Sequence, residues 1–219
     1  MAEEAKQFRM FVGTNAKSVL TEVSKTLRIE MKKYLNEYAR TVAEIFVEDA
    51  KKRLKASGYN NSEKLAENIF FQRSVGYGNY RIGIKGDNET KEVMFYLEFG
   101  TGFVGRDNPH DMASEVGWEY AINENAVDSQ GKPIYFDLTK PKGQQGLNSF
   151  YAPTPDPKKG MKGWIYKDKE TGALVATSGL KAVSYIWDTF KDIENIKKKA
   201  KERMNNGKQP VPRRRIVRK

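Results

Sequence analysis

The sequence predicts an α+β fold in which a long N-terminal helix and a C-terminal helix pack on a small antiparallel β-sheet, with an inserted loop-rich β lobe. Three observations lead to this prediction. Apolar residues recur at spacings of three and four between residues 15 and 54, and again near the C-terminus, as on one face of a helix. Alternation around a glycine turn at 69 to 85 indicates a β-hairpin. Residues 103 to 172 mix aromatic residues with glycine and proline, which is typical of a loop-rich insertion.

The composition limits the size of the core. The chain has 219 residues, of which 38% are hydrophobic, and this suits one core of ordinary size or one core with an appended lobe. We therefore expect an arm at 1 to 14, a single domain at 15 to 204 with its insertion at 103 to 172, and a basic tail at 205 to 219. The chain has no cysteine, which excludes disulfides and thiolate metal sites and makes a reducing compartment the natural setting.

The net charge is +11, from 39 Lys and Arg against 28 Asp and Glu, and it indicates an acidic or polyanionic neighbour. The excess lies mainly at the C-terminus, where residues 197 to 219 contain Glu202 as their single acid. The basic tail itself comprises Arg213, Arg214, Arg215, Arg218 and Lys219. No apolar run approaches the roughly 20 residues that cross a bilayer, and the first residues do not resemble a signal peptide. We expect a soluble protein made in the cytoplasm, with no membrane partner.

The N-terminal helix is predicted to begin with Asn15 as its cap and to end near Gly58, since no Pro or Gly lies between them. Such a helix has about 40 residues and a length of roughly 60 Å. Its whole apolar stripe is too long for a small sheet, so part of it should contact another chain. The alternative is a single bend that gives two ordinary helices on one core. Residues 1 to 14 form either an apolar plug against a neighbour or a frayed terminus. The stripe comprises Val19, Val23, Leu27, Met31, Leu35, Tyr38, Val42, Ile45, Phe46 and Leu54.

The hairpin at 69 to 85 turns at Gly76-Tyr77-Gly78-Asn79, where the glycine spacing lacks the Lys and Ser or Thr of a phosphate-binding loop. The next apolar run, Met94 to Phe99, is either a strand or the end of a short helix. It contains Glu98, and burying a carboxylate needs compensation. Glu98 is therefore paired with Lys or Arg, hydrogen-bonded to backbone amides, or located on an exposed edge.

The lobe contains three candidate strands, at 134 to 138, 164 to 167 and 173 to 176, with the last two joined as a hairpin. Its interleaved aromatic residues and lysines could form a nucleic-acid stacking surface, but acids are nearly as frequent there. A final helix is expected after a cap at Thr177 or Ser178. It should fade at 197 to 201 and stop at 205 to 207.

No motif indicates catalysis. His110 is the sole histidine and has one adjacent acid, Asp111, which is too few ligands for a metal site. The chain has no Gly-x-Ser-x-Gly elbow. A pair of carboxylates that meet only in the folded chain stays an alternative. We expect a protein that is not an enzyme and that uses neither a cofactor nor a metal.

Several short motifs lie in the order found in one family. Glu98-Phe99-Gly100-Thr101 follows an aromatic run, a hairpin and a long helix. This arrangement resembles the head-to-tail joining proteins of tailed bacteriophages, the tail-completion family typified by the tenth gene product of a lambda-like siphophage. Glu63 stands where that family usually has glycine, and Ala182-Val183-Ser184 replaces its usual Ser-x-Pro-Phe. The resemblance covers roughly residues 15 to 200, and it includes Ser62-Glu63-Lys64-Leu65 with Ile69, Asn108-Pro109-His110, Gly117-Trp118-Glu119-Tyr120, and Thr177-x-Gly179 followed by Tyr185-Ile186-Trp187.

The resemblance implies a structural virion protein that forms a homo-oligomeric ring, a hexamer or dodecamer, at the neck or head-proximal tail end. Implied partners are further copies of the chain, the portal and connector proteins, and the tail terminator or tail tube protein. Assembly would occur in the bacterial host cytoplasm. The basic tail would enter an acidic groove of a neighbour or face the DNA passage; alternatively, the chain is a nucleic-acid-binding protein acting through this tail. The expected motif and interface residues are Leu97, Glu98, Phe99, Gly100, Thr101, Trp118, Trp164 and Trp187.

Overall fold

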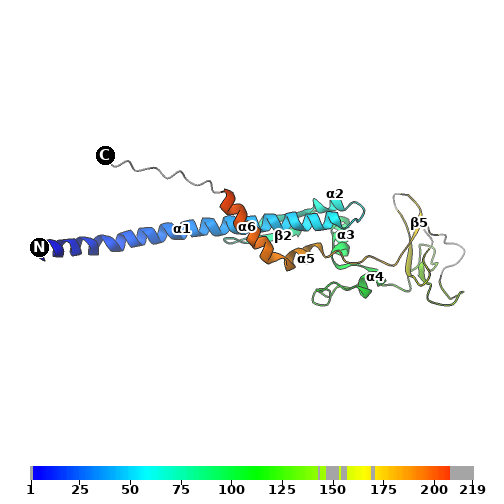
Figure 1. The fold of residues 1–219 in the computed structure, drawn as a ribbon. Coiled ribbons are helices and arrows are strands. Elements are labelled where there is room, and N and C mark those ends of the chain that lie inside the picture. The colour runs from blue at the N-terminus through cyan, green and yellow to red at the C-terminus, as the bar shows by residue number, and fades with distance from the viewer. Residues whose placement is uncertain (1, 143, 147–152, 154–156, 169–170, 208–219) are drawn as a thin grey trace. The chain divides into compact units, whose positions relative to one another are not determined.

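The computed structural model describes residues 2–142, 144–146, 153, 157–168 and 171–207, with side chains from residue 21 onward. Figure 1 shows its helices and strands. The fold class is α+β, as predicted, because the helices accompany a two-stranded and a three-stranded antiparallel sheet. The elements are α1 (Ala2–Ala56), α2 (Ser62–Ala66), β1 (Ile69–Arg73), β2 (Tyr80–Ile84), α3 (Asn88–Phe99), α4 (Gly102–Asp107), β3 (Tyr135–Asp137), β4 (Lys162–Lys167), β5 (Leu174–Thr177), α5 (Tyr185–Lys191) and α6 (Ile193–Gly207).

The chain forms two compact units, whereas the sequence suggested one domain with an inserted lobe. The first unit contains Met1–Asp49, Phe70–Gly83 and Asp192–Lys219, and the second contains Ala50–Ile69 and Ile84–Lys191. The expected insertion at 103 to 172 is therefore part of a larger second unit. No described helix has the length and hydropathy needed to span a membrane.

Helix α1 is one continuous helix of 55 residues. The predicted start at Asn15 was wrong, because residues 2 to 14 continue the same helix, and the bend considered as an alternative is not observed. The early segment is rich in Ala, Glu, Lys and Gln, whose high helix propensity offsets the cost of Gly13. At the other end Gly58 has a φ of +70°, as expected for the glycine that follows a helix.

In the first unit, α1 packs with the β1–β2 hairpin and α6. Ile45, Phe46 and Val47 of α1 are buried, and α6 buries residues spaced by four on one face, Ile196, Ala200 and Met204. The Arg203 guanidinium donates to both Glu48 carboxylate oxygens, at 3.2 and 2.8 Å. The predicted hairpin is confirmed, and its turn glycines Gly76 and Gly78 both have positive φ.

In the second unit, the three predicted lobe strands are confirmed as a sheet of order β3-β4-β5. Both pairings are antiparallel, with Tyr135 opposite Trp164 and Ile165 opposite Ala176. Strand β4 begins two residues earlier than predicted, at Lys162. The core of the unit comprises Ala50, Leu54, Ala66, Ile69, Met94, Leu97, Phe103, Ala113, Phe136, Ile165 and Tyr185.

The C-terminal helix starts later than predicted. Neither Thr177 nor Ser178 caps it, because α5 begins at Tyr185 and a turn at Asp192 separates it from α6. The segment before α5 uses its backbone groups elsewhere: Leu180 N donates to Thr101 O at 3.1 Å, and Val183 N donates to Leu97 O at 2.6 Å. The backbone N–H groups of this segment therefore bond to a distant part of the chain, and the segment does not form the helical turn that a local cap would have started.

Candidate functional site

The stretch that contains Glu98 is a helix, which resolves the alternatives left open by its apolar pattern. The Asp87 side chain caps α3 by accepting from Thr90 N at 2.8 Å. Hydrogen bonds from the Thr90 side chain and from the Thr90 amide hold the pKa of Asp87 below its ordinary value. The helix ends at Gly100, whose N–H donates to Tyr96 O at 2.8 Å and whose φ is +82°. A helix that stops in this way presents Glu98 in its last turn, beside the chain segment that follows.

Glycines let two distant segments touch immediately after α3. Thr101 N donates to Leu180 O at 2.8 Å, and a Cβ on Gly102 would lie 2.5 Å from Ser178 O. A Cβ on Gly179 would overlap Thr101 O. The motifs Gly100-Thr101-Gly102 and Thr177-x-Gly179 therefore contact each other through their backbones. We call Glu98–Gly102 together with residues 178 to 187 the Glu98 joint.

Glu98 is 6% exposed and accepts two backbone hydrogen bonds from the first turn of α5. Ile186 N donates to Oε2 at 2.9 Å and Trp187 N donates to Oε1 at 2.8 Å. Of the three possibilities for this carboxylate, the structure shows hydrogen bonding to backbone amides. The side chain replaces the missing cap of α5 from 88 residues away in the chain.

His110 completes the surroundings of Glu98. It is 5% exposed, and its Nδ1 accepts from Met112 N at 3.0 Å, so the ring proton belongs on Nε2. Nε2 lies 3.3 Å from Glu98 Oε1 but is directed away from the line of a good hydrogen bond. Burial raises the pKa of Glu98, while the Ile186 and Trp187 amides and His110 offset part of this rise.

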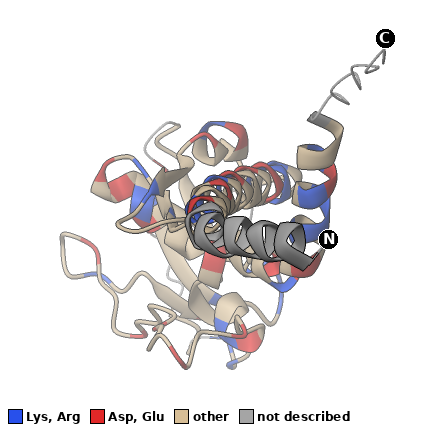
Figure 2. Cartoon of the chain, turned by 90° about the vertical axis from the view of Figure 1, so that its left-hand side faces the viewer, with Lys and Arg blue, Asp and Glu red and all other residues tan. Residues whose placement is uncertain are grey.

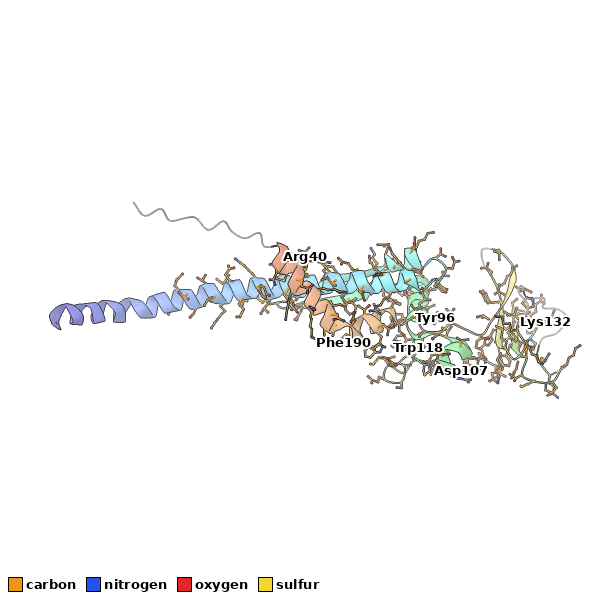
Figure 3. All side chains as sticks on the ribbon, viewed as in Figure 1. Arg40, Tyr96, Asp107, Trp118, Lys132 and Phe190 are labelled. Atoms are coloured by element: carbon orange, nitrogen blue, oxygen red, sulfur yellow. The ribbon has the colours of Figure 1, made fainter. Side chains whose placement is uncertain are left out.

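Aromatic rings enclose this polar centre. Phe99 stacks on Trp118 at 4.9 Å between ring centroids and lies 4.6 Å from the His110 ring. Trp118 Nε1 donates to Gly100 O at 3.0 Å, and Trp118 also meets Tyr96 edge to face at 6.0 Å; both rings are labelled in Figure 3. The rings thus fix the end of α3 and satisfy the carbonyl group of Gly100, the residue that follows the helix.

Trp187 connects the Glu98 joint to the surface. Its Nε1 donates to Asp111 Oδ2 at 2.9 Å, and its ring stacks on exposed Phe190 at 5.4 Å. Lys191 also donates to Asp111 Oδ2, at 3.2 Å. The Trp187 and Lys191 donors hold the pKa of Asp111 below its ordinary value. Sequence reasoning missed this contact because Asp111 and Lys191 are 80 residues apart.

Trp164 belongs to a different cluster, in the three-stranded sheet. It stacks on Phe103 at 5.4 Å, and its Nε1 donates to Asn123 O at 2.6 Å. The cation of Arg106 lies 5.0 Å from the Phe103 ring centroid. The predicted site residues therefore divide into the Glu98 joint, with Trp118 and Trp187 around it, and this separate cluster.

Three of the predicted interface residues are not accessible. Leu97 is 1% exposed, Glu98 is 6% exposed and Gly100 is buried, so all three are enclosed by their own chain and are not available for a direct contact with another subunit. Phe99, Thr101 and the three tryptophans are half-buried, and their role in an interface stays a prediction. The basic tail residues Arg213, Arg214, Arg215, Arg218 and Lys219 lie outside the described residues.

The geometry around Glu98 favours a structural role over a chemical one. Both carboxylate oxygens are occupied by backbone amides, and neither Glu98 nor His110 is open to a substrate. Within the described ranges, no group of three or more Asp, Glu or His residues could hold a metal ion. The arrangement ties the end of α3 to the beginning of α5.

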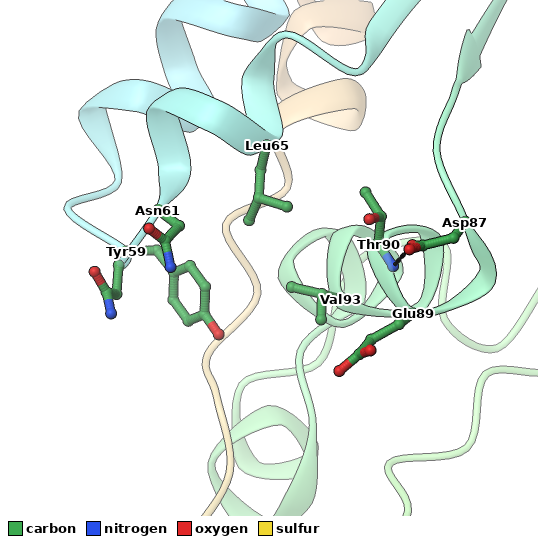
Figure 4. A pocket seen from close by; sticks show the side chains of 8 residues that line it. Tyr59, Asn61, Leu65, Asp87, Glu89, Thr90 and Val93 are labelled. Carbon is green, nitrogen blue, oxygen red and sulfur yellow. Dashed lines mark hydrogen bonds between the residues drawn. The ribbon is translucent and has the colours of Figure 1, made fainter. Parts of the chain in front are cut away.

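A shallow hollow of about 280 Å³ lies between the α2 segment and the start of α3. Figure 4 shows the Asp87 carboxylate turned to the Thr90 amide, so this acid serves as a helix cap. The hollow is lined by Tyr59, Asn60, Asn61, Leu65, Asp87, Glu89, Thr90 and Val93.

A further candidate surface lies on α1. Every residue from 21 to 35 is exposed, including several large apolar ones. We call Val23, Leu27, Met31, Tyr34 and Leu35 the α1 stripe; their exposed fractions are 47%, 63%, 65%, 42% and 50%. Apolar side chains gathered on one face of a helix indicate a surface that another element covers.

No protein-family model, curated protein or solved structure matches this chain. The tail-completion family named from the short motifs therefore stays a prediction.

Proposed function

We propose that the chain is a structural virion protein of a tailed phage or phage-tail-like particle. In this proposal it forms a ring at the neck or head-proximal tail end and joins the connector to the tail. The observation that carries the proposal is the ordered set of short motifs centred on Glu98-Phe99-Gly100-Thr101, which resembles the head-to-tail joining proteins.

The local geometry of these motifs supports a structural role. Gly100, Thr101 and Gly179 bring two chain segments into backbone contact, and Glu98 caps α5. Each motif residue thus serves the fold, and none is presented to a substrate.

The α1 stripe supports the assembly part of the proposal. Large apolar side chains along residues 23 to 35 would lose their contact with water in an interface, which is the main driving force for subunit association. A ring forms when one surface of a subunit binds a different surface of the next and the rotation closes.

The test is the copy number of this protein in purified phage or tail particles, measured by quantitative mass spectrometry against the major tube protein. The proposal expects six or twelve copies per particle, which corresponds to a single ring. Absence from finished particles would overturn it. The tube protein, present in many stacked rings, is the internal standard that separates a single ring from a tube component.

A second candidate, a nucleic-acid-binding protein, is favoured by the exposed lysines of α6. Lys198, Lys199 and Lys201 are exposed and precede the basic tail in the sequence, and Figure 2 shows basic residues along this helix. The test measures duplex DNA binding against salt concentration. It compares the full chain with a deletion of 208 to 219 and with Lys198, Lys199 and Lys201 changed to Glu. If this candidate is correct, the affinity for DNA should fall steeply as the salt concentration rises, and both variants should lose binding. An affinity that does not depend on salt concentration would contradict it.

A further inference from the structure

The α1 stripe continues a seam that the same chain buries further along α1. Val23, Tyr34 and Ile45 are spaced by eleven residues, and Met31 and Val42 have the same spacing. An eleven-residue repeat corresponds to about 3.67 residues per turn, close to the roughly 3.6 of an α-helix, so the seam drifts only slowly around the helix. Ile45 is 5% exposed and Val23 is 47% exposed. One seam therefore passes from a covered half to an uncovered half.

Within the first unit, the hairpin and α6 cover the buried half. Tyr38, Val42 and Phe46 line a hollow of about 300 Å³ together with Tyr80 and Lys197, from β2 and α6. Further toward the N-terminus, Tyr34 stacks on Tyr38 at 6.4 Å, and its exposed fraction is 42%. From residue 35 back to residue 21, no described element of this unit buries the stripe, since all these residues are exposed.

Charged residues of opposite sign flank the stripe. At roughly 100° per residue, Glu30 and Glu37 lie on one flank, two turns apart, and Arg28 and Lys32 lie on the other, one turn apart. All four are exposed. Glu30 accepts from Lys33 at 2.9 Å, but both side chains are more than half exposed, and such pairs are weak and easily exchanged. Lys32 lies 4.9 Å from the Tyr77 ring centroid.

We propose that the α1 stripe pairs with the α1 stripe of a second copy of this chain, and that the two helices are parallel. In a parallel pair, the acidic flank of each helix faces the basic flank of the other. In an antiparallel pair, acidic flank meets acidic flank and basic meets basic, which is repulsive. The charge pattern is thus complementary to itself in only one of the two orientations.

The pairing uses residues 21 to 45 and stands on them alone, so it can hold even if the proposed virion role fails. If that role is also correct, the ring needs a second and different contact, because a surface that pairs with its own copy closes a dimer and not a ring. The two proposals are tested separately: pairing is measured on purified full-length protein, and the virion role is measured on particles.

Cysteine cross-linking tests the orientation, since the chain has no cysteine of its own. Val23→Cys and Met31→Cys are eight residues, about 12 Å, apart on the helix. Parallel pairing predicts that each variant forms a disulfide with itself under mild oxidation. Antiparallel pairing predicts cross-links in a mixture of the two variants and at most one self-linked variant. Ile29→Cys is the matched control, because Ile29 is 54% exposed but lies on the opposite face of α1, and it should form no disulfide-linked dimer.

Charge exchange tests the flanks. The acidic-flank variant changes Glu30 and Glu37 to Lys, and the basic-flank variant changes Arg28 and Lys32 to Glu. Each alone should weaken the dimer about tenfold or more in sedimentation equilibrium. A single chain carrying all four changes should dimerise again, because its flanks are exchanged but still complementary. Circular dichroism verifies that each variant keeps its helix content.

Two results would overturn the proposal. One is a wild-type chain that stays monomeric at concentrations of hundreds of micromolar. This result would mean that the α1 stripe does not bind a second copy of the chain. The other is cross-linking that appears only in the mixed sample, between a Val23→Cys chain and a Met31→Cys chain, which would make the helices antiparallel. Pairing in solution with no copies in particles would sustain this inference and reject the virion role.

Discussion

The Glu98 joint and the α1 stripe differ in burial: the joint is enclosed by its own chain, whereas the stripe is exposed. At the joint, Glu98 is almost completely buried, and both of its carboxylate oxygens are matched by donors from the same chain. Along the stripe, Leu27 and Met31 are more than 60% exposed. Residues at the joint are constrained by folding, whereas residues on the stripe are free to be selected for binding. Changes at the joint should therefore alter stability, and changes on the stripe should alter association.

The largest effect is expected at Gly179. Gly179→Ala should reduce the free energy of unfolding by about 3 kcal/mol or more, because the new Cβ would overlap Thr101 O and the φ of Gly179 is +101°. Chemical denaturation of the full chain measures the loss. The matched control is Gly117→Ala, where φ is +65° and no atom lies within 4 Å of a new Cβ. Its expected loss is about 1–2 kcal/mol, the cost of positive φ alone. Equal losses in both variants would mean that the close contact at Gly179 contributes nothing.

A smaller loss is expected for Glu98→Gln. The amide oxygen can still accept one backbone N–H, but the amide nitrogen then faces the other, which leaves a buried donor unsatisfied at a cost of about 1–3 kcal/mol. Thermal and chemical denaturation measure this loss. Glu115→Gln, at an exposed position, is the control and should change stability by less than about 0.5 kcal/mol. Two equal, small values would contradict the capping role of Glu98.

The pH dependence of the same variant gives a finer test. The folded-state pKa of Glu98 lies above its ordinary value of 4.5, so between these values the folded chain binds a proton that the unfolded chain has lost. Glu98 therefore contributes stability below pH 4.5 that is lost as pH rises through its folded pKa. As the pH rises from 4.5 through the folded-state pKa of Glu98, the wild-type chain should therefore lose stability relative to Glu98→Gln. A constant difference would indicate that the backbone amides and His110 fully offset burial.

The smallest effect on stability is expected on the stripe. Leu27→Gln keeps a good helix former and should change the free energy of unfolding of the monomer by less than about 0.5 kcal/mol. The same change should weaken self-association, measured by sedimentation, because Leu27 is 63% exposed in the isolated chain. Thr26→Gln, one position away from the stripe, is the control. If Leu27→Gln instead caused a large loss of stability and left self-association unchanged, Leu27 would serve folding and not association, which contradicts the role given to the α1 stripe.

Local patterns were enough for the regular elements. The hairpin at Ile69–Ile84, the β4–β5 pair and the continuous α1 follow from alternation, glycine turns and helical spacing, all of which act over a few residues. The error at the start of α1 arose because Asn15 is a good cap residue, yet the preceding residues favour helix as well. A cap residue marks a helix start only where the chain before it leaves the helix.

The function of the motif residues could not be predicted from local patterns. Glu98 was recognised as a carboxylate in need of partners, but its donors, Ile186 and Trp187, are 88 and 89 residues away. The same distance explains why Thr177 and Ser178 were wrongly expected to cap the last helix. Their segment is held to Thr101 and Gly102 instead. His110 was judged by its ligand count and not by its place beside Glu98.

The amino-acid sequence by itself determined the α+β class, the presence of a long N-terminal helix, the positions of the strands and the seam of eleven-residue spacing. These depend on backbone propensity and on the periodic placement of apolar side chains. Only the tertiary structure decided where α5 begins, which groups satisfy Glu98, and which half of the α1 seam is covered. The reason is physical: a buried carboxylate, a tight glycine contact and an exposed stripe are all defined by neighbours that lie far away along the chain.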